Sequence, residues 1–372
     1  MRKNNESKLA DQELEYYSRQ IILPNLGYDG QLRLRDSSVC ITGVGGLGSA
    51  AATQLAALGV GHLRLVDYDV VELSNLHRQH LYDVSAIGYP KVEVAAKRLR
   101  NLNPYIHVEP VPLAIGAHNA EEIVESMDIV VDGLDSMLPR YAINRACLNL
   151  EVPYVFGAAV SMYGNVSTIL PHDTACLECF QGSVDDDAVP SCSVLGVHPS
   201  IVDLIASVEV AEATRTLLDQ KPRLANKLLH CDIEALEFAQ VALSKNPNCA
   251  ACGSGTASPA TREHSPVTEL CARTGHRTFS IIPPQDLSLD MEQVHDLVQQ
   301  RGFQVAVSAR LGITFHWAPS GKASLLSSGV MIVEGARDEG EAYELFSSLV
   351  TEGLSSQQSD APNRSRQERH EN

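Results

Sequence analysis

The sequence is poor in aromatic residues, which make up 5% of it with a single tryptophan, and it has no excess of positive charge. Its 29 lysines and arginines stand against 46 aspartates and glutamates, which gives a formal net charge of −17. A negative field of this size repels phosphate backbones, so a general nucleic-acid-binding role is excluded. A small basic site for a single nucleotide remains compatible with this charge.

The N-terminal residues lack the apolar run of a secretory signal, since the sequence starts Met-Arg-Lys-Asn-Asn-Glu-Ser-Lys. The longest uncharged stretch, residues 37–61, contains six glycines and is better explained as strand, turn and helix than as a membrane span. Nine cysteines without a signal indicate reduced thiols rather than a disulfide framework. We therefore expect a cytoplasmic protein without membrane contact.

The length of 372 residues, 44% of them apolar, is enough for two domains. In the first two thirds of the chain, short apolar runs alternate with segments of helical length. We expect strands at residues 38–42, 62–67, 108–113, 128–132, 152–159 and 165–170, helices at 47–58, 90–102, 121–127, 139–150 and 200–218, and a hairpin over 227–243. This alternation is typical of an α/β fold with a doubly wound, Rossmann-like, mostly parallel sheet.

The composition changes after residue 253. Residues 254–266 are rich in Gly, Ser, Thr and Pro, which predicts a linker between a nucleotide-binding domain at 1–253 and a small α+β domain at 267–351. In the small domain we expect strands at 278–282, 303–309, 312–317 and 330–333, and helices at 291–301 and 339–349. The polar tail, residues 352–372, is predicted to be disordered.

A glycine-rich turn, with Gly43, Gly45, Gly46 and Gly48, follows the first predicted strand and opens the first long helix. Gly43 permits the tight turn, Gly45 lets backbone approach a phosphate, and Gly48 permits close packing of helix on strand. Asp67 ends the second strand, where a carboxylate can bond a ribose hydroxyl. The pattern predicts a nucleotide site. It leaves open whether the ligand is a dinucleotide cofactor, as in an NAD-dependent oxidoreductase, or another nucleotide.

The polar residues that follow Asp67 favour a triphosphate: Asp69, Ser74, Asn75, Arg78 and Lys91. Attack on an α-phosphate builds negative charge on that phosphorus and on the leaving pyrophosphate, which Arg78 and Lys91 can stabilise. Asp135 follows the fourth strand, at the edge where such sheets bind ligands, and can hold Mg²⁺. The alternative is that Arg78 and Lys91 are ordinary surface ion-pair partners.

Two Cys-x-x-Cys pairs occur in the second half of the large domain: Cys176, Cys179, Cys249 and Cys252. Four thiolates around one tetrahedral ion make a closed, structural zinc site. A redox dithiol is the alternative, weakened because neither pair is expected at the strand-to-helix start typical of thioredoxins. We expect a zinc ion that staples the loop after the sheet to the chain just before the linker.

Taken together, these motifs resemble the ThiF/MoeB/HesA family, the bacterial relatives of ubiquitin-activating enzymes. The resemblance covers about residues 12–253, and its motifs occur in the family's order: Tyr17 to Ile21, Gly43 to Gly48, Asp67-Tyr-Asp69, Ser74 to Gln79, Pro90-Lys91, Asp135 and the two cysteine pairs. It implies that ATP and Mg²⁺ are used to adenylate the C-terminal glycine of a ubiquitin-like sulfur carrier protein ending in Gly-Gly, with release of pyrophosphate. It also implies a homodimer and a zinc ion on the four cysteines.

The resemblance assigns roles within the nucleotide site. It implies that Gly45 and Gly46 cradle phosphate and that Asp67 bonds the ribose. Asn75, Arg78 and Lys91 would contact the phosphates, with Ser74 to Arg78 lining the site and Asp135 binding Mg²⁺. The expected nucleotide site comprises Gly43, Gly45, Gly46, Gly48, Asp67, Asp69, Ser74, Asn75, Arg78, Lys91 and Asp135.

Further expectations concern residues outside this set. The resemblance implies that Arg19 reaches the nucleotide of the partner subunit. Many members have Asn where this chain has Ser136, which puts the neighbouring nucleotide contact in question. Some members use a cysteine at the place of Cys192 for a covalent link to the carrier, so a covalent relay and an inert loop thiol both stay open. Cys271 lies in a segment similar to an extension of some members and is expected to be a core thiol.

The sequence therefore predicts an adenylyltransferase acting on a sulfur carrier, as a step towards thiocarboxylate formation in thiamine or molybdopterin type pathways. Other relatives of this fold activate a peptide or a tRNA-linked substrate, and inactive halves of heterodimeric activating enzymes only bind. Arg19, Arg78, Lys91 and Asp135 together argue against an inactive half. The NAD-dependent oxidoreductase stays as a remote alternative.

Overall fold

A computed structural model describes residues 8–182, 184, 195–255, 266–273 and 275–353. The chain divides into two compact units, Met1–Arg262 and Glu263–Asn372. The predicted linker at 254–266 and the predicted tail at 352–372 lie largely outside the described residues. The predicted domain boundaries therefore stay predictions.

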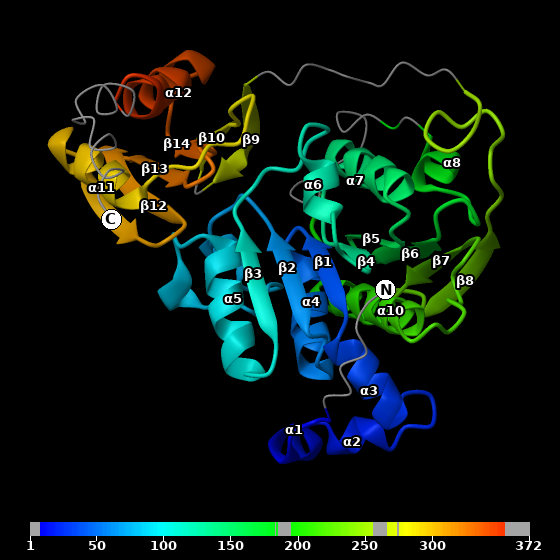
Figure 1. Ribbon diagram of the computed structural model, residues 1–372. Coiled ribbons are helices and arrows are strands. Elements are labelled where there is room, and N and C mark those ends of the chain that lie inside the picture. Colours follow the sequence, from blue (N-terminus) through cyan, green and yellow to red (C-terminus); the bar gives the residue numbers. More distant parts are fainter. Residues whose placement is uncertain (1–7, 183, 185–194, 256–265, 274, 354–372) are drawn as a thin grey trace, which may run out of the picture. The chain divides into compact units, whose positions relative to one another are not determined.

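An eight-stranded sheet forms the centre of the first unit, in the order β3-β2-β1-β4-β5-β6-β7-β8 (Figure 1). Its parallel half contains β3 (His107–Val111), β2 (His62–Val66), β1 (Ser38–Thr42), β4 (Ile129–Asp132) and β5 (Tyr154–Val160). The apolar runs expected from the sequence form these strands, because parallel strands lie between two helical layers. Strand order reverses between β1 and β4, so the loops after these strands diverge and leave room for a ligand.

Helices cover both faces of this sheet, as a Rossmann-like fold requires. One face carries α4 (Gly46–Leu58), α5 (Lys91–Leu102) and α10 (Pro199–Leu217), and the other carries α6 (Ala120–Val124), α7 (Met137–Asn149) and α8 (Leu177–Gln181). Gly59, at a φ of +84°, ends α4 as a left-handed cap. The helices predicted for the large domain are confirmed, with ends displaced by at most three residues.

The second half of the sheet is antiparallel. It contains β6 (Tyr163–Ile169), β7 (Lys227–Asp232) and β8 (Glu237–Ala242). The hairpin predicted over 227–243 is confirmed as β7 and β8. Its pairing with β6, which extends the main sheet, is a long-range contact that local sequence patterns do not reveal.

Three short helices precede the sheet: α1 (Asp11–Tyr16), α2 (Ser18–Ile21) and α3 (Gly27–Arg35). Gln20 Nε2 donates to Leu58 O at 2.8 Å, and Tyr16 Oη donates to Leu102 O at 3.1 Å. These carbonyls end α4 and α5, at the edge of the sheet where β1 and β2 begin. Because α4 has 13 residues, α2 lies about 20 Å from the other end of that helix.

The second unit contains a six-stranded antiparallel sheet, in the order β11-β12-β13-β14-β10-β9. Its strands are β9 (Val267–Arg273), β10 (His276–Ile281), β11 (Gln304–Ser308), β12 (Gly312–Ala318), β13 (Gly321–Leu326) and β14 (Met331–Glu334). Helices α11 (Met291–Gln300) and α12 (Glu339–Phe346) pack around the buried Phe279 and Phe315. The α+β prediction is confirmed. The sequence pattern does not indicate β13, which begins with Gly321, Lys322 and Ala323, residues of low strand propensity.

The uncharged stretch at residues 37–61 forms β1, the glycine turn, α4 and the turn into β2, as expected. Within the described part of the chain, no helix combines the length and the apolar content needed to cross a bilayer.

Candidate functional site

The glycine turn between β1 and α4 lies at the carboxyl edge of the sheet, beside the loop that follows β4. Gly43 has a φ of +82°, and a Cβ there would lie 2.6 Å from Gly133 O. A Cβ on Gly48 would lie 1.8 Å from Gly43 O, so the helix can approach the strand only without that side chain. Gly45 is the N-cap of α4, and the free N–H groups of the first turn point past it. Phosphate binding by Gly45 and Gly46 stays a prediction.

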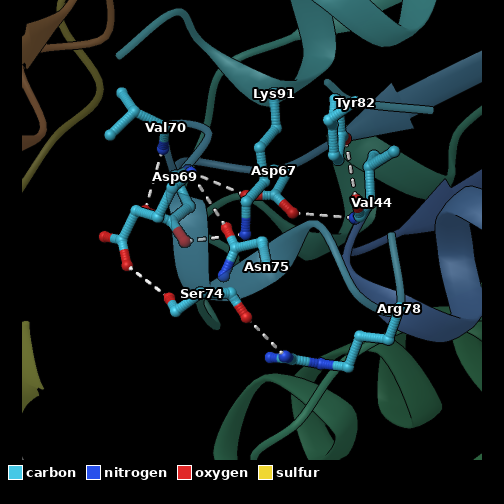
Figure 2. Close-up of polar contacts among 10 residues, drawn as sticks. Val44, Asp67, Asp69, Val70, Ser74, Asn75, Arg78, Tyr82 and Lys91 are labelled. Carbon is cyan, nitrogen blue, oxygen red and sulfur yellow. Dashed lines mark hydrogen bonds and ion pairs between the residues drawn. The ribbon is translucent and has the colours of Figure 1, made fainter. Parts of the chain in front are cut away.

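Asp67 follows β2, and its carboxylate points at the glycine turn (Figure 2). Its Oδ2 accepts the Val44 N–H at 2.7 Å, and its Oδ1 accepts the Asp69 N–H at 2.7 Å. Each carboxylate oxygen can accept a further hydrogen bond, so ribose hydroxyls can still be bound. Burial raises the pKa of Asp67, while the nearby Lys91 ammonium opposes that rise. The structure thus gives Asp67 a second task, which is to fix the turn.

A buried Lys91 and a partly buried Asp69 form an ion pair beside Asp67. Lys91 is the first residue of α5 and is 5% exposed, and its Nζ lies 2.7 Å from Asp69 Oδ2. The Lys91 N–H also donates to Asp69 O at 2.9 Å, so backbone and side chain hold the same partner. A cation at a helix N-terminus is disfavoured by the helix dipole, which makes the acidic partner necessary. The surface ion-pair alternative is therefore wrong for Lys91.

The segment from Glu72 to Arg78 lies next to this pair and includes a 3-10 turn, η1 (Leu73–Asn75). Asn75, which is 7% exposed, accepts the Glu72 N–H at its Oδ1. Ser74 Oγ donates to a Glu72 carboxylate oxygen at 3.2 Å. Arg78 Nη1 donates to Ser74 O at 3.0 Å, which leaves other guanidinium donors for a ligand (Figure 2). The structure therefore brings Asp67, Asp69, Ser74, Asn75, Arg78 and Lys91 together, and their binding of a nucleotide stays a prediction.

Arg78 and two residues that follow it lie beside three successive residues of the glycine turn. Tyr82 Oη donates to Val44 O at 2.8 Å, the Gln79 amide lies beside Gly45, and Arg78 Cδ lies beside Gly46. Sequence reasoning did not assign Gln79 or Tyr82 to the site. The available signal was the position of Gln79 directly after Arg78 in the motif, and Tyr82 had no such signal.

Asp135 is exposed in the loop between β4 and α7, at the same carboxyl edge as the glycine turn. The base of this loop is fixed by Asp132, which accepts the Leu134 N–H at 2.8 Å and Arg140 Nε at 2.9 Å. Tyr154 Oη donates to the same carboxylate at 2.5 Å. Burial raises the pKa of Asp132, and Arg140 and Tyr154 oppose that rise. Sequence reasoning missed this buried cluster, since a charged residue after an apolar strand was its only signal.

Arg19 does not join the site within its own chain. It is exposed on α2, which is bonded to the far end of α4. Figure 1 shows α1 and α2 at the end of α4 opposite the glycine turn. Its predicted action on the partner's nucleotide stays a prediction.

The four cysteines of the two Cys-x-x-Cys pairs converge, although 69 residues separate Cys179 from Cys249 in the sequence. All four sulfur atoms lie within 4.8 Å of one another. Cys176 and Cys249 sulfurs are 3.6 Å apart, and Cys179 and Cys252 sulfurs are 3.4 Å apart. A zinc ion with sulfur ligands at about 2.3 Å in a tetrahedron needs sulfur separations of about 3.8 Å. The donor set and its spacing therefore fit zinc.

Residues around the cluster hold the cysteine loop in place. Arg145 on α7 forms a two-pronged ion pair with Glu178, with both N–O distances at 2.9 Å. Asn144 accepts the Leu177 N–H at 3.0 Å, and the Asn246 N–H donates to Cys179 sulfur at 3.4 Å. Such outer contacts orient metal ligands.

One Cys-x-x-Cys pair lies at a helix start, contrary to the expectation from the sequence. Cys176 is the N-cap of α8, so its pair does lie at a helix start. The fold nevertheless favours a metal, because it places the second cysteine pair next to the first. Burial raises the pKa of the Cys176 thiol, whereas hydrogen bonds from the Asn246 N–H and the neighbouring thiols outweigh burial and lower the pKa of Cys179. The convergence of the four sulfurs, and not their ionisation, therefore favours the metal.

Two further cysteine predictions remain open. Cys192 lies outside the described residues, so its covalent or inert role stays a prediction. Cys271 lies in β9, and its side chain is outside what the structure describes.

The chain matches the ThiF family over residues 17–251. It is 41% identical over 249 residues to a sulfur carrier protein adenylyltransferase of Thermus thermophilus, which covers 65% of this chain and 92% of that protein. It is 36% identical over 248 residues to the molybdopterin-synthase adenylyltransferase of Escherichia coli, which covers 66% of this chain and 99% of that protein.

Among solved structures, the crystal structure of E. coli MccB + MccA-N7isoASN aligns with 64% of this chain and 74% of its own, with a TM-score of 0.57. At 24% identity this likeness supports the fold alone. The matched residues 17–251 make up well over half of the 372 residues. They include the glycine turn, the ion pair and the four cysteines, and the chain belongs to the ThiF family.

Proposed function

We propose that this chain uses ATP and Mg²⁺ to adenylate the C-terminal glycine of a ubiquitin-like sulfur carrier protein, as a step towards a thiocarboxylate. Within the family, relatives that the chain covers over 92% and 99% of their length are adenylyltransferases, and so is this chain. Their names state a sulfur carrier protein and molybdopterin synthase, which supports a carrier of that class here. The NAD-dependent oxidoreductase is excluded.

The observation that carries the proposal is the buried Lys91–Asp69 pair beside the glycine turn. In the reaction, a carboxylate oxygen of the carrier attacks the α-phosphorus, and the bond from that phosphorus to the pyrophosphate oxygen breaks. Negative charge grows on the α-phosphate and on the leaving pyrophosphate. Lys91 is already held in place by Asp69, so its positive charge stabilises the transition state without reorganisation. Arg78 supplies a second, planar cation from the neighbouring segment.

The Mg²⁺ ion that accompanies the phosphates is assigned to Asp135. Its carboxylate is exposed at the carboxyl edge, in the loop after β4, which pairs directly with β1. Magnesium is bound through one or two carboxylates plus substrate phosphates, which one exposed aspartate at this place can satisfy. When bound there, the ion would neutralise phosphate charge. The buried Asp132 and Arg140 keep the Asp135 loop in position.

The four-cysteine cluster is assigned to a structural zinc ion. Four sulfur ligands fill a tetrahedral zinc, so no position is left for water or substrate. The cluster joins α8 to the chain segment at 249–252, which follows β8. Zinc therefore stabilises the fold beside the sheet and takes no part in adenylation.

The active unit is proposed to be a homodimer in which Arg19 acts on the partner's nucleotide. Ile22 and Leu23, which follow α2, are 74% and 53% exposed, and Leu73 beside the nucleotide site is 68% exposed. In a two-fold dimer, a patch on one subunit can cover a different patch on the other, twice. Placing α2 of each subunit over Leu73 of the other would bury these apolar residues and bring Arg19 to the phosphates.

The test is detection of the adenylated carrier. The protein is incubated with ATP, Mg²⁺ and ubiquitin-like proteins ending in Gly-Gly from the same genome, and the carrier mass is measured. An AMP adduct at the carrier's C-terminus is expected. The matched control is the same carrier without its last glycine, which should stay unmodified. Failure of every Gly-Gly-ended carrier to become adenylated would refute the proposal.

A further inference from the structure

The two Cys-x-x-Cys segments, residues 176–179 and 249–252, each contain one buried and one partly exposed cysteine. We call each segment a hook. Cys176 in the first hook is 0% exposed, and Cys249 in the second hook is 3% exposed. The other member of each hook, Cys179 or Cys252, is partly exposed. A small polar solute can therefore reach Cys179 and Cys252, whereas the other two cysteines are shielded from it.

The two accessible cysteines also lie close together, although they belong to different hooks. Their sulfur atoms are 3.4 Å apart, which is less than the 3.8 Å between the sulfurs of Cys176 and Cys179 in the first hook. In the sequence, Cys179 and Cys252 are 73 positions apart. If either accessible sulfur is oxidised, a thiol of the other hook is therefore within reach of it.

The hooks are held in place by contacts that need no metal. The ion pair of Arg145 holds the first hook on α7. The second hook is a hydrogen-bonded turn, in which the Cys249 N–H donates to Asn246 O at 2.9 Å and the Gly253 N–H donates to Cys249 O at 3.0 Å. The Asn246 N–H also donates to Cys179 sulfur, so it connects the two hooks. The hooks should therefore keep facing each other when a metal leaves.

We propose that Cys179 and Cys252 form a peroxide-sensitive site, at which hydrogen peroxide joins the two hooks by a disulfide bond. One thiolate sulfur attacks a peroxide oxygen, the O–O bond breaks, hydroxide leaves and a sulfenic acid forms. The second thiolate attacks the sulfenic sulfur, so the S–S bond forms and the S–O bond breaks with loss of another hydroxide. The two sulfurs lose two electrons in total, which the peroxide accepts. Both hydroxide ions take protons from the solvent and become water.

The disulfide then replaces the metal as the connection between the hooks. After oxidation only Cys176 and Cys249 remain as thiolate ligands, so zinc binding is weakened. The new bond still joins α8 to the segment after β8, and because it closes a long loop it restricts the unfolded chain strongly. The protein therefore loses zinc to peroxide without losing this connection, and a reducing thiol reverses the change. The inference rests on the structural zinc assigned under the proposed function.

The test treats the zinc-loaded, full-length protein with hydrogen peroxide and maps its disulfides by mass spectrometry without reduction. We expect a Cys179–Cys252 bond as the first product, with about one zinc ion released per bond. The melting temperature of the oxidised protein should stay closer to that of the zinc form than to that of reduced protein stripped by a chelator. Zinc content is measured before oxidation. Protein that never holds zinc would refute the zinc assignment, and the disulfide map would then decide on the redox site separately.

Two variants separate this site from general oxidation. Cys252→Ser should form no bond between the hooks, because Cys249 is buried, and after peroxide it should melt like the stripped protein. Cys231→Ser is the matched control, since Cys231 is buried in β7 outside the cluster, and it should oxidise like the wild type. A first bond within one hook, such as Cys176–Cys179, would overturn the proposal. So would a wild-type cluster that keeps four free thiols under peroxide, or an oxidised wild type that melts like the stripped protein.

Discussion

The nucleotide site at the carboxyl edge of the sheet, called the nucleotide edge below, and the cysteine cluster are held together in opposite ways. Both consist of groups from distant parts of the chain. At the nucleotide edge, unlike groups hold one another: Lys91 lies on Asp69, Asp67 accepts backbone N–H groups, and Arg78 donates to a carbonyl. Asp67 keeps an acceptor and Arg78 a donor to spare, so a ligand can come and go. The cluster instead brings four like groups, all sulfur, within 4.8 Å. One tetrahedral zinc ion would close such a set, and its contribution would be to stability.

The largest expected effect comes from removing metal ligands. The double variant Cys249→Ser with Cys252→Ser should lose its zinc, because two serines do not replace two thiolates. Zinc binding in small structural sites is worth about 10 kcal/mol or more of folding free energy, so the loss of stability should exceed about 4 kcal/mol. Metal analysis and the free energy of unfolding check this. Cys231→Ser is the control, since Cys231 is buried in β7 outside the cluster. A double variant that keeps wild-type zinc and stability would contradict the assignment.

The next effect concerns rate rather than stability. Arg78→Ala and Lys91→Ala should each lower the rate of ATP–pyrophosphate exchange by about 10²-fold to 10³-fold, the usual loss for one charge-stabilising donor. Zinc content should be unchanged in both. Arg98→Ala removes an exposed cation of α5 that pairs with Asp83 and should exchange normally. Exchange at nearly the wild-type rate in both site variants would remove these residues from the mechanism.

Subunit mixing tests whether the nucleotide edge of one chain needs a residue of the partner subunit. Arg19→Ala and Lys91→Ala proteins should each be inactive alone. In an exchanged equimolar mixture, half of the dimers are mixed and each holds one intact site, so about a quarter of wild-type activity should return. The assay is pyrophosphate exchange after subunit exchange, with each variant mixed with itself as control. No recovery in mixtures shown to contain heterodimers would refute action in trans.

Glu209 lies in neither the nucleotide edge nor the cysteine cluster, and its replacement gives the smallest expected effect. It is fully buried on α10 against Gly157, and neither carboxyl oxygen has a hydrogen-bond partner among the described residues. Burial raises the pKa of Glu209 well above its usual value, Asp132 raises it further, and Arg140 opposes the rise. The unfolded carboxyl loses its proton near pH 4.3. Between that pH and the raised folded pKa, the folded state therefore binds more protons than the unfolded state.

It follows that stability falls as pH rises through this window, by at most about 1.4 kcal/mol per pH unit for one proton. Glu209→Gln should remove this slope. The variant should match the wild type near pH 4 and gain on it towards neutral pH. Chemical unfolding at several pH values measures the difference, and Glu237→Gln on the exposed β8 is the control. A constant difference between Glu209→Gln and wild type at all pH values would contradict a neutral buried carboxyl.

The order of strands and helices, the glycine turn and the cysteine set could be predicted from the sequence, because each is a local pattern with a physical cause. Gly43 and Gly48 are required by backbone geometry, and the structure gives both reasons directly. What the sequence could not supply is pairing between distant segments. The Asp132–Arg140 cluster, the contact of Gln79 with Gly45, and the joining of β7 to β6 each depend on the finished fold.

The same limit explains the errors. Cys176 caps a five-residue helix that is too short to show a helical period in sequence. In the sequence, only the early position of Arg19 in the chain indicates that it lies away from its own nucleotide site. The structure adds the contact of α2 with the far end of α4. Predicted residues that lie outside the described part of the chain, Cys192 above all, stay predictions.

The most direct test of the central claim is ATP–pyrophosphate exchange measured with a Gly-Gly-ended carrier, in wild type and in Lys91→Ala. If the nucleotide edge is built for reversible adenylation, label from pyrophosphate should enter ATP only when the intact carrier is present. Removal of the carrier's last glycine should abolish it, and Lys91→Ala should lower it by about 10²-fold or more while keeping its zinc. Exchange that ignores the carrier, or that persists in Lys91→Ala, would contradict the account.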